Sequence, residues 1–139
     1  MFKVFGVVLL VMALAIAIIP NFTDCNSQGK FITMQSGKTT DMKCHWTGKA
    51  EIAVAVPIFG IGALLTFNRR RQSLMNLSAM GIILGAFAIA LPTNHLIGVC
   101  GTPGMICNSV MKPSLTALGA VVTGVSLFGV VLSSRMKKD

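Results

Sequence analysis

Four long apolar runs alternate with polar segments along this chain, and the third run is the clearest. Residues 74–91 contain no charged side chain, and a helix of that length is about long enough to cross the hydrocarbon core of a bilayer. Comparable runs occupy residues 4–20, 50–67 and 114–132. The pattern therefore predicts an all-α membrane protein in which four transmembrane helices form a bundle.

Two long polar segments and one short segment connect these runs. Residues 21–49 and 92–113 form the long loops, and residues 68–73 form a tight connection. In the first long loop, two β-prone stretches flank a Ser-Gly pair, which is typical of a small β-hairpin. Because the spans and loops use up all 139 residues, we expect a single membrane domain.

The first apolar run has a competing interpretation as a signal peptide. It is long for the apolar region of a signal, and no small-residue cleavage pattern follows Ile19. Cleavage would also leave an odd number of spans and disturb the charge pattern described below. We therefore expect the first span to remain part of the protein.

Composition and charge support a membrane protein and argue against a nucleic-acid partner. Hydrophobic residues make up 53% of the chain and charged residues 12%, about half the charge of a typical soluble domain. The formal net charge is +8, but the basic residues lie in loops at both ends of the predicted spans. They do not gather on one amphipathic element, so the predicted partner is the lipid bilayer.

The basic residues also predict which side of the membrane each loop occupies. Four spans place both termini and the 68–73 connection on one side, together with every arginine and most of the basic residues. The positive-inside rule makes that side cytoplasmic, in a prokaryotic plasma membrane. The two long loops then lie outside, where disulfide bonds persist.

All the cysteines lie in these two outer loops: Cys25, Cys44, Cys100 and Cys107. Four cysteines allow three pairings. We favour the local pairs, Cys25 with Cys44 around the hairpin and Cys100 with Cys107 around a turn-rich segment. A cross-loop pairing such as Cys44 with Cys100 stays open. The predicted role is a disulfide-bonded cap on the outer face of the bundle.

Two chemical roles for the cysteines are alternatives to a structural cap. Four helices with cysteine pairs in the outer loops resemble the layout of quinone-coupled thiol oxidases, but the chain has no C-x-x-C motif. Thioether, thiol and imidazole groups near Cys44 and Cys107 would suit Cu(I), although a disulfide would remove the thiolates. Without other catalytic motifs, the sequence predicts no catalytic residue, no cofactor and no metal site.

Small residues at a spacing of four predict where the helices pack. Gly81 and Gly85 lie on the third span, and Ala120 and Gly124 lie on the fourth. Such residues let two backbones approach closely, which favours association in lipid. We expect these faces to pack within the bundle, with a homo-oligomer interface as the alternative.

Three polar residues are further candidates for a functional role. Glu51, near the start of the second span, could bind a proton or a cation, although a solvated carboxylate beside Lys49 is the simpler interpretation. His45 and His95 fall in the outer loops, where a pH-sensing role is the less ordinary alternative. No charged residue lies near the midplane of a predicted span, which argues against a channel or transporter.

Three segments carry a resemblance to a known family: residues 42–51 (MKCHWTGKAE), 96–100 (LIGVC) and 105–108 (MICN). They resemble signature segments of the small bacterial and archaeal membrane proteins described as domain of unknown function 4418. The resemblance implies four spans and cysteine-containing outer loops, and it supplies no catalytic role. Some such proteins occur beside export-type ABC transporter components, which implies an accessory membrane subunit.

The sequence as a whole therefore favours a non-enzymatic membrane subunit. It would pack through small residues and present its outer loops to a membrane-protein partner or to a second copy. A membrane thiol–disulfide oxidoreductase and a Cu(I)-binding protein are the two alternatives.

Overall fold

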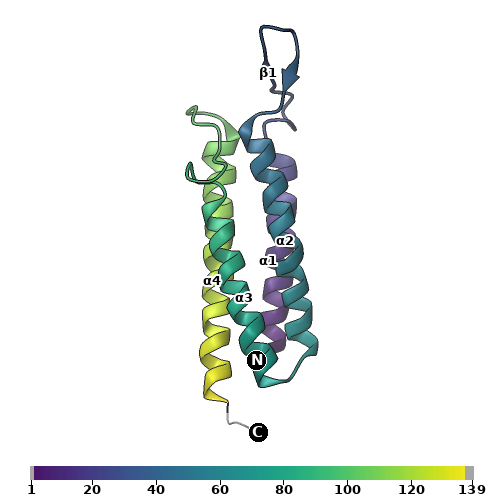
Figure 1. The fold of residues 1–139 in the computed structure, drawn as a ribbon, viewed down its shortest axis with the longest axis vertical. Helices are drawn as coiled ribbons and strands as arrows, with labels where there is room; N and C mark the ends of the chain where they lie inside the picture. Colours follow the sequence, from purple (N-terminus) through teal and green to yellow (C-terminus); the bar gives the residue numbers. More distant parts are fainter. Residues whose placement is uncertain (1, 137–139) are drawn as a thin grey trace.

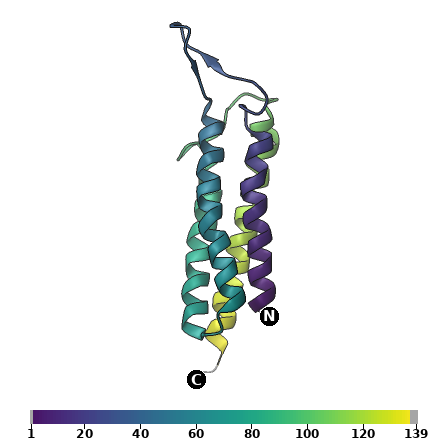
Figure 2. The same cartoon turned by 90° about the vertical axis from the view of Figure 1, so that its right-hand side faces the viewer.

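The computed structural model describes residues 2–136, and they form an elongated bundle of four long helices (Figures 1 and 2). All four helices are long and apolar enough to cross a membrane, as the sequence predicted. A short π-helix, η1, leads directly into the last of them. The elements are α1 (Phe2–Thr23), α2 (Lys43–Phe67), α3 (Arg71–Ala90), η1 (Cys107–Met111) and α4 (Lys112–Arg135).

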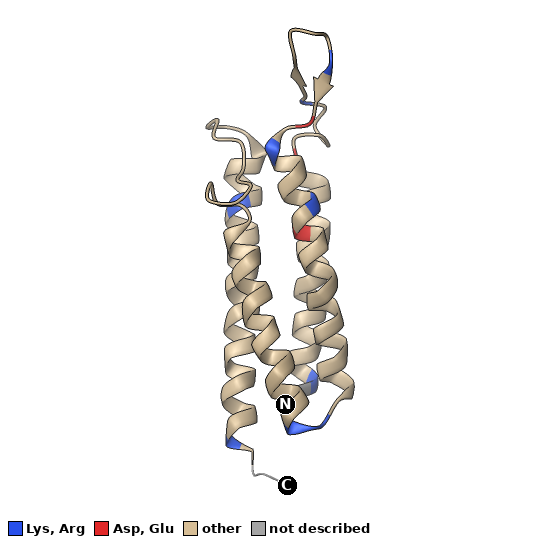
Figure 3. Ribbon diagram, in the orientation of Figure 1, with Lys and Arg blue, Asp and Glu red and all other residues tan. Residues whose placement is uncertain are grey.

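The outer surface of the bundle is apolar along its length. Only 28% to 33% of the most apolar part of each helix is buried inside the protein, so most of its apolar side chains face outward. Figure 3 shows that Lys and Arg lie toward the two ends of the bundle and are absent from its middle. A long, uncharged and apolar belt of this kind is what the hydrocarbon core of a bilayer requires.

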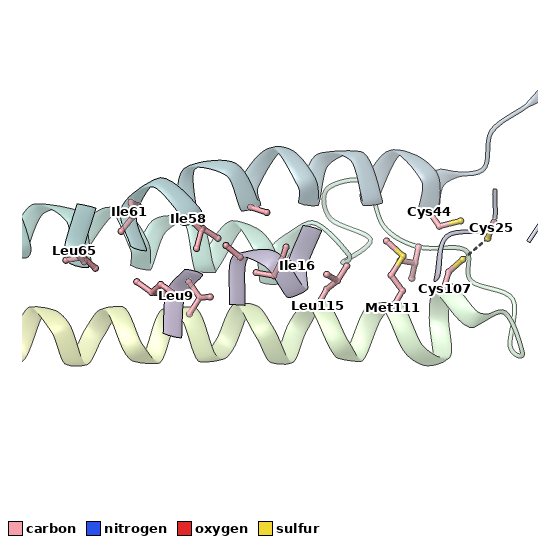
Figure 4. Packing of buried hydrophobic residues seen from close by; sticks show 14 of the residues in the cluster. Leu9, Ile16, Cys25, Cys44, Ile58, Ile61, Leu65, Cys107, Met111 and Leu115 are labelled. Carbon is pink, nitrogen blue, oxygen red and sulfur yellow. Dashed lines mark hydrogen bonds between the residues drawn. The ribbon is translucent and has the colours of Figure 1, made fainter. Parts of the chain in front are cut away.

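The helices pack as two antiparallel pairs, α1 with α2 and α3 with α4, and the two pairs meet along a narrower contact (Figure 1). In the first pair the backbones touch at two glycines. A Cβ atom at Gly62 would lie 2.9 Å from the carbonyl oxygen of Gly6, so no larger residue fits at this crossing. Buried aliphatic side chains, including Leu9, Ile16 and Ile58, fill the interior between the pairs (Figure 4).

The second pair uses Gly81 and Gly85 of α3, two of the residues expected to pack. A Cβ atom at Gly85 would lie 2.9 Å from the backbone nitrogen of Thr123 and 3.1 Å from the carbonyl oxygen of Gly119. The expected face of α4 needs correction. Gly124 has open space around it, because the face that meets α3 is the neighbouring one that carries Gly119.

The exposed side of α4 includes Ala120, so the Ala120–Gly124 face points away from the bundle. One helical position is a rotation of about 100°, which moves a residue from the contact to the surface. The spacing correctly predicted that small residues of α4 contact α3. It selected the face of Ala120 and Gly124, whereas the contact uses the neighbouring face with Gly119.

Each of the four helices extends beyond its predicted apolar run, and the extensions of α2 and α3 matter most for the fold. α2 begins at Lys43 rather than near residue 50, so Cys44 and His45 lie on a helix and not in a loop. α3 begins at Arg71, whose guanidinium donates hydrogen bonds to the carbonyl oxygens of Ser133 (2.9 Å) and Ser134 (3.0 Å). These carbonyls end α4, so one of the three arginines binds a helix C-terminus.

The predicted β-hairpin is present and projects beyond the end of the bundle opposite the start of α1 (Figure 2). Strand β1 (Ile32–Thr33) pairs antiparallel with β2 (Thr39–Thr40), with Ile32 opposite Thr40. Gly37 forms part of the turn with a φ of 77°, a conformation that glycine adopts without strain. Every residue of the hairpin is exposed, so the buried core of the protein lies in the helical bundle.

Candidate functional site: a cluster of four cysteines

The four cysteines, which are far apart in the sequence, meet in one cluster at the hairpin end of the bundle. Cys25 follows the end of α1, Cys44 lies in the first turn of α2, Cys100 belongs to the loop before η1, and Cys107 begins η1. Cys25, Cys44 and Cys107 are buried and Cys100 is partly exposed. All four are free thiols in the structure.

The sulfur atoms lie at or near contact distance. Cys25 Sγ is 2.6 Å from Cys107 Sγ, the closest approach (dashed line in Figure 4). Cys100 Sγ lies 3.6 Å from Cys44 Sγ and 3.9 Å from Cys25 Sγ. Met42 adds a fifth sulfur, its Sδ being 3.9 Å from Cys100 Sγ. The cluster therefore contains two close cross-loop pairs, Cys25 with Cys107 and Cys44 with Cys100, and the 3.9 Å contact of Cys25 with Cys100 connects them.

These distances bear directly on the pairing expected from the sequence. The closest contact, that of Cys25 with Cys107, belongs to neither of the local pairs, Cys25 with Cys44 and Cys100 with Cys107. The nearest contacts instead join the first loop to the second, as in the cross-loop alternative that the sequence left open. The reason is the fold: η1 packs against α1, which brings together cysteines that chain spacing had assigned to separate loops.

A polar network holds the first loop against the start of α2. The Asp24 carboxylate accepts a hydrogen bond from the Ser27 backbone N–H (2.8 Å) and lies 3.0 Å from Nδ1 of His45. Burial alone would raise the pKa of Asp24, but its hydrogen bonds with His45 and Ser27 outweigh burial and hold that pKa below the ordinary value. His45 thus fixes the residue that precedes Cys25, which is a structural contact that its predicted loop position did not suggest.

The second loop is tied to the same helix by Thr47. Its hydroxyl is fully buried and donates a hydrogen bond of 2.5 Å to the carbonyl oxygen of Gly98. Gly98 has a φ of 77°, and its N–H donates to the carbonyl oxygen of Leu91, so the loop turns back on itself there. This turn brings Cys100, two residues later, over Cys44.

The π-helix places the remaining cysteine. In η1 the Lys112 N–H donates to the carbonyl oxygen of Cys107, five residues earlier, and the wider turn shifts the side chains of this segment relative to α4. Met111 is fully buried next to the cluster, on its side toward the bundle core (Figure 4). Short π-helical turns are frequent at functional sites, and nothing in the sequence pattern signalled this one.

Burial and crowding also control the chemistry of the thiols. Burial raises the pKa of the Cys25 thiol far above its ordinary value, and the neighbouring thiols of Cys107 and Cys44 raise it further. Cys25 is therefore held as the neutral thiol. Cys100, the partly exposed cysteine, is the member of the cluster that a molecule from outside meets first.

The other predicted polar residues have different surroundings. His95 is exposed in the second loop, away from the hydrogen-bond networks of the cluster. Lys49 lies over the ring of Trp46, with Nζ 5.4 Å from the ring centroid, and does not pair with Glu51. Glu51 is fully buried, which overturns the expectation of a solvated carboxylate.

The comparison with family models decides what the chain is. A family model matches residues 2–132, nearly the whole length. The chain belongs to the family described as domain of unknown function 4418. The resemblance noted in the loop segments is therefore confirmed. No curated protein and no solved structure shows significant similarity to this member of the family.

Proposed function

We propose that this protein is a membrane thiol–disulfide exchange protein, whose reaction takes place in the four-cysteine cluster. One observation supports the proposal above all. Cys100 Sγ lies near contact with two different sulfurs, those of Cys44 and Cys25. A purely structural cap needs only two separate pairs, whereas exchange needs a sulfur that can bond to either of two partners.

The exchange can be written with atoms and electrons balanced. Starting from a Cys25–Cys107 disulfide, the Cys100 thiolate attacks Cys25, forms a Cys25–Cys100 bond and releases Cys107 as a thiolate. The Cys44 thiolate then attacks Cys100, forms Cys44–Cys100 and releases Cys25. No net electron is consumed, and the disulfide has moved from the buried pair to the pair that includes the partly exposed cysteine.

Net oxidation or reduction of a partner needs a source or sink of electrons. We assign the reaction with the partner to a dithiol or disulfide of another protein, which reacts at Cys100 because that sulfur is accessible. We assign the reoxidation of the cluster to a lipid-soluble quinone, which accepts two electrons. A bundle with an apolar exterior would meet such a molecule in the bilayer. The C-x-x-C motif of known quinone-coupled oxidases is absent here, and the cross-loop pairs would take its place.

An aromatic disulfide that releases a coloured thiol tests the proposal on the reduced, purified protein. Cys100 should displace one coloured thiol, and a neighbouring cysteine should then displace the second as it bonds to Cys100. A variant lacking both neighbours, Cys25→Ser with Cys44→Ser, should keep the adduct on Cys100, as seen by mass spectrometry. Cys107→Ser is the matched control and should still resolve it. A lasting adduct on the wild-type protein would refute exchange.

A soft-metal site is the second candidate, because three buried sulfurs lie within 4.8 Å of one another and Met42 adds a thioether. Cu(I) suits such a ligand set. The same sulfurs would serve as metal ligands in this function and as disulfide partners in the exchange reaction. Titration of the reduced protein with Cu(I) against a competing chelator distinguishes the two functions.

The proposed orientation follows the charges of the two ends. We place the cysteine cluster and the hairpin outside a prokaryotic plasma membrane and both termini in the cytoplasm. The partner in exchange would then be an exported or membrane protein, which keeps the expected role as an accessory subunit. Gly81 and Gly85 are occupied by α4 within the chain, so a second copy would have to use another face.

A further inference from the structure

Glu51 is a buried carboxyl group without a partner. Its side chain is fully buried, and neither carboxyl oxygen has a hydrogen-bond partner among residues 2–136. It lies on α2, on the same buried face as Cys44, Thr47 and Gly48. An ionisable group in a membrane-spanning helix is costly and usually serves a function.

Its surroundings are apolar and closely packed. At Gly48, one helical turn nearer the cluster, a Cβ atom would lie 3.0 Å from Cβ of Pro20 and 3.7 Å from Cε of Met111. Pro20 of α1 and Met111 of η1 therefore close over this face of α2. Glu51 lies beneath that closure, in the interior of the bundle.

No cation of the neighbouring elements compensates a negative charge at Glu51 in the described part of the chain. On α2 itself, Lys49 is exposed and lies over Trp46. On α4, Lys112 lines a surface groove with Asn108 of η1 and other residues of α4. The basic residues of α1 and α3 belong to the opposite end of the bundle.

The remaining titratable groups at this end of the bundle are the cysteine thiols, His45 with its acidic partners Asp24 and Asp41, and the exposed side chains of His95, Lys30, Lys38 and Lys43. An ionised carboxylate in a dry, apolar interior without a counter-ion is far less stable than the neutral acid. The neutral carboxylic acid is therefore the form that this environment favours.

We propose that Glu51 is a proton-binding site that exchanges protons with the cysteine cluster above it. The inference rests on the proposed thiol–disulfide function. Glu51 follows Cys44 by about two helical turns, a rise of about 10 Å. Thr47 lies between them on the same buried face, with its hydroxyl donating to the carbonyl oxygen of Gly98.

Thiol–disulfide exchange in a buried site requires a proton donor. When Cys107 or Cys25 leaves as a thiolate in a buried site, it requires a proton, because water is excluded there. Glu51 would donate that proton and become a carboxylate for a short time. It would regain a proton from the thiol that attacks next, so no proton is gained or lost over the exchange.

Infrared difference spectroscopy on the full chain in detergent tests the site directly. A protonated carboxylic acid has a carbonyl stretching band that a carboxylate lacks. The chain has only four acidic side chains, so assignment through Glu51→Gln is straightforward. We expect the band at neutral pH in the wild-type protein, its loss in Glu51→Gln, and a shift of the band between the oxidised and the reduced cluster.

Kinetics of disulfide movement within the protein test the link to the thiols. In protein prepared with the Cys25–Cys107 disulfide and quenched with acid at timed intervals, we expect Glu51→Gln to slow the appearance of the Cys44–Cys100 disulfide at least tenfold. The reaction of Cys100 with the aromatic disulfide in the reduced protein should be unchanged. Glu51→Asp should restore part of the rate. Absence of the carbonyl band, or an unchanged rate of disulfide movement in a folded Glu51→Gln protein, would overturn the proton site. Failure of the wild-type protein to release a second coloured thiol would instead overturn the exchange function.

Discussion

A single methyl group at Gly85 should separate α3 from α4. The added Cβ would lie 2.9 Å from the Thr123 nitrogen and 3.1 Å from the Gly119 oxygen, both of them backbone atoms that cannot rotate away. Ordinary van der Waals contact begins at about 3.4 Å, so the helices must move apart by about 0.5 Å. Overpacking of this kind costs about 1–3 kcal/mol.

Gly124→Ala is the matched control, because Gly124 lies on the same helix pair with open space around it. Both substitutions gain the same helix propensity, up to about 1 kcal/mol, so the difference between the two variants isolates the packing. Reversible unfolding in mixed micelles, followed by circular dichroism, measures it. We expect Gly85→Ala to be less stable than Gly124→Ala by about 1–3 kcal/mol. Equal stability would refute the proposed helix contact.

Three further predictions concern the ends of the bundle. Arg71→Lys should lower the free energy of unfolding by about 1–2 kcal/mol in the same assay, because lysine cannot donate the two hydrogen bonds to the end of α4. Gly98→Ala should slow the second thiol release, since its φ of 77° strains any other residue and moves the loop that carries Cys100. Asp24 has a lowered pKa, so its contribution to stability is complete above its ordinary pKa of 3.8 and is lost as the pH falls through the folded value. Asp24→Asn should remove this acid dependence in a pH series of unfolding curves.

Helix type, helix number and the hairpin could be predicted from the sequence because they follow from local patterns. An uncharged apolar run such as residues 74–91 satisfies its own backbone only as a helix in lipid. The packing of Gly81 and Gly85 against another helix could also be predicted, since small residues at that spacing allow close helix contacts.

The site depends on contacts that local patterns do not encode. The meeting of Cys25 with Cys107 requires the end of α1 to lie beside η1, and chain spacing favoured local pairs instead. The start of α2 at Lys43 was missed because its first turn is polar, although it carries Cys44. Burial of Glu51 depends on the packing of α1 and η1 against one face of α2, which periodicity along a single helix cannot reveal.

A map of disulfide-linked peptides after mild oxidation of the purified protein, made without reductant, most directly tests the convergence of both loops on one cluster. We expect Cys25 to be linked to Cys107 and Cys44 to Cys100. Peptides that link Cys25 to Cys44 and Cys100 to Cys107 alone would contradict the cluster, and with it the exchange reaction that we assign to this family member.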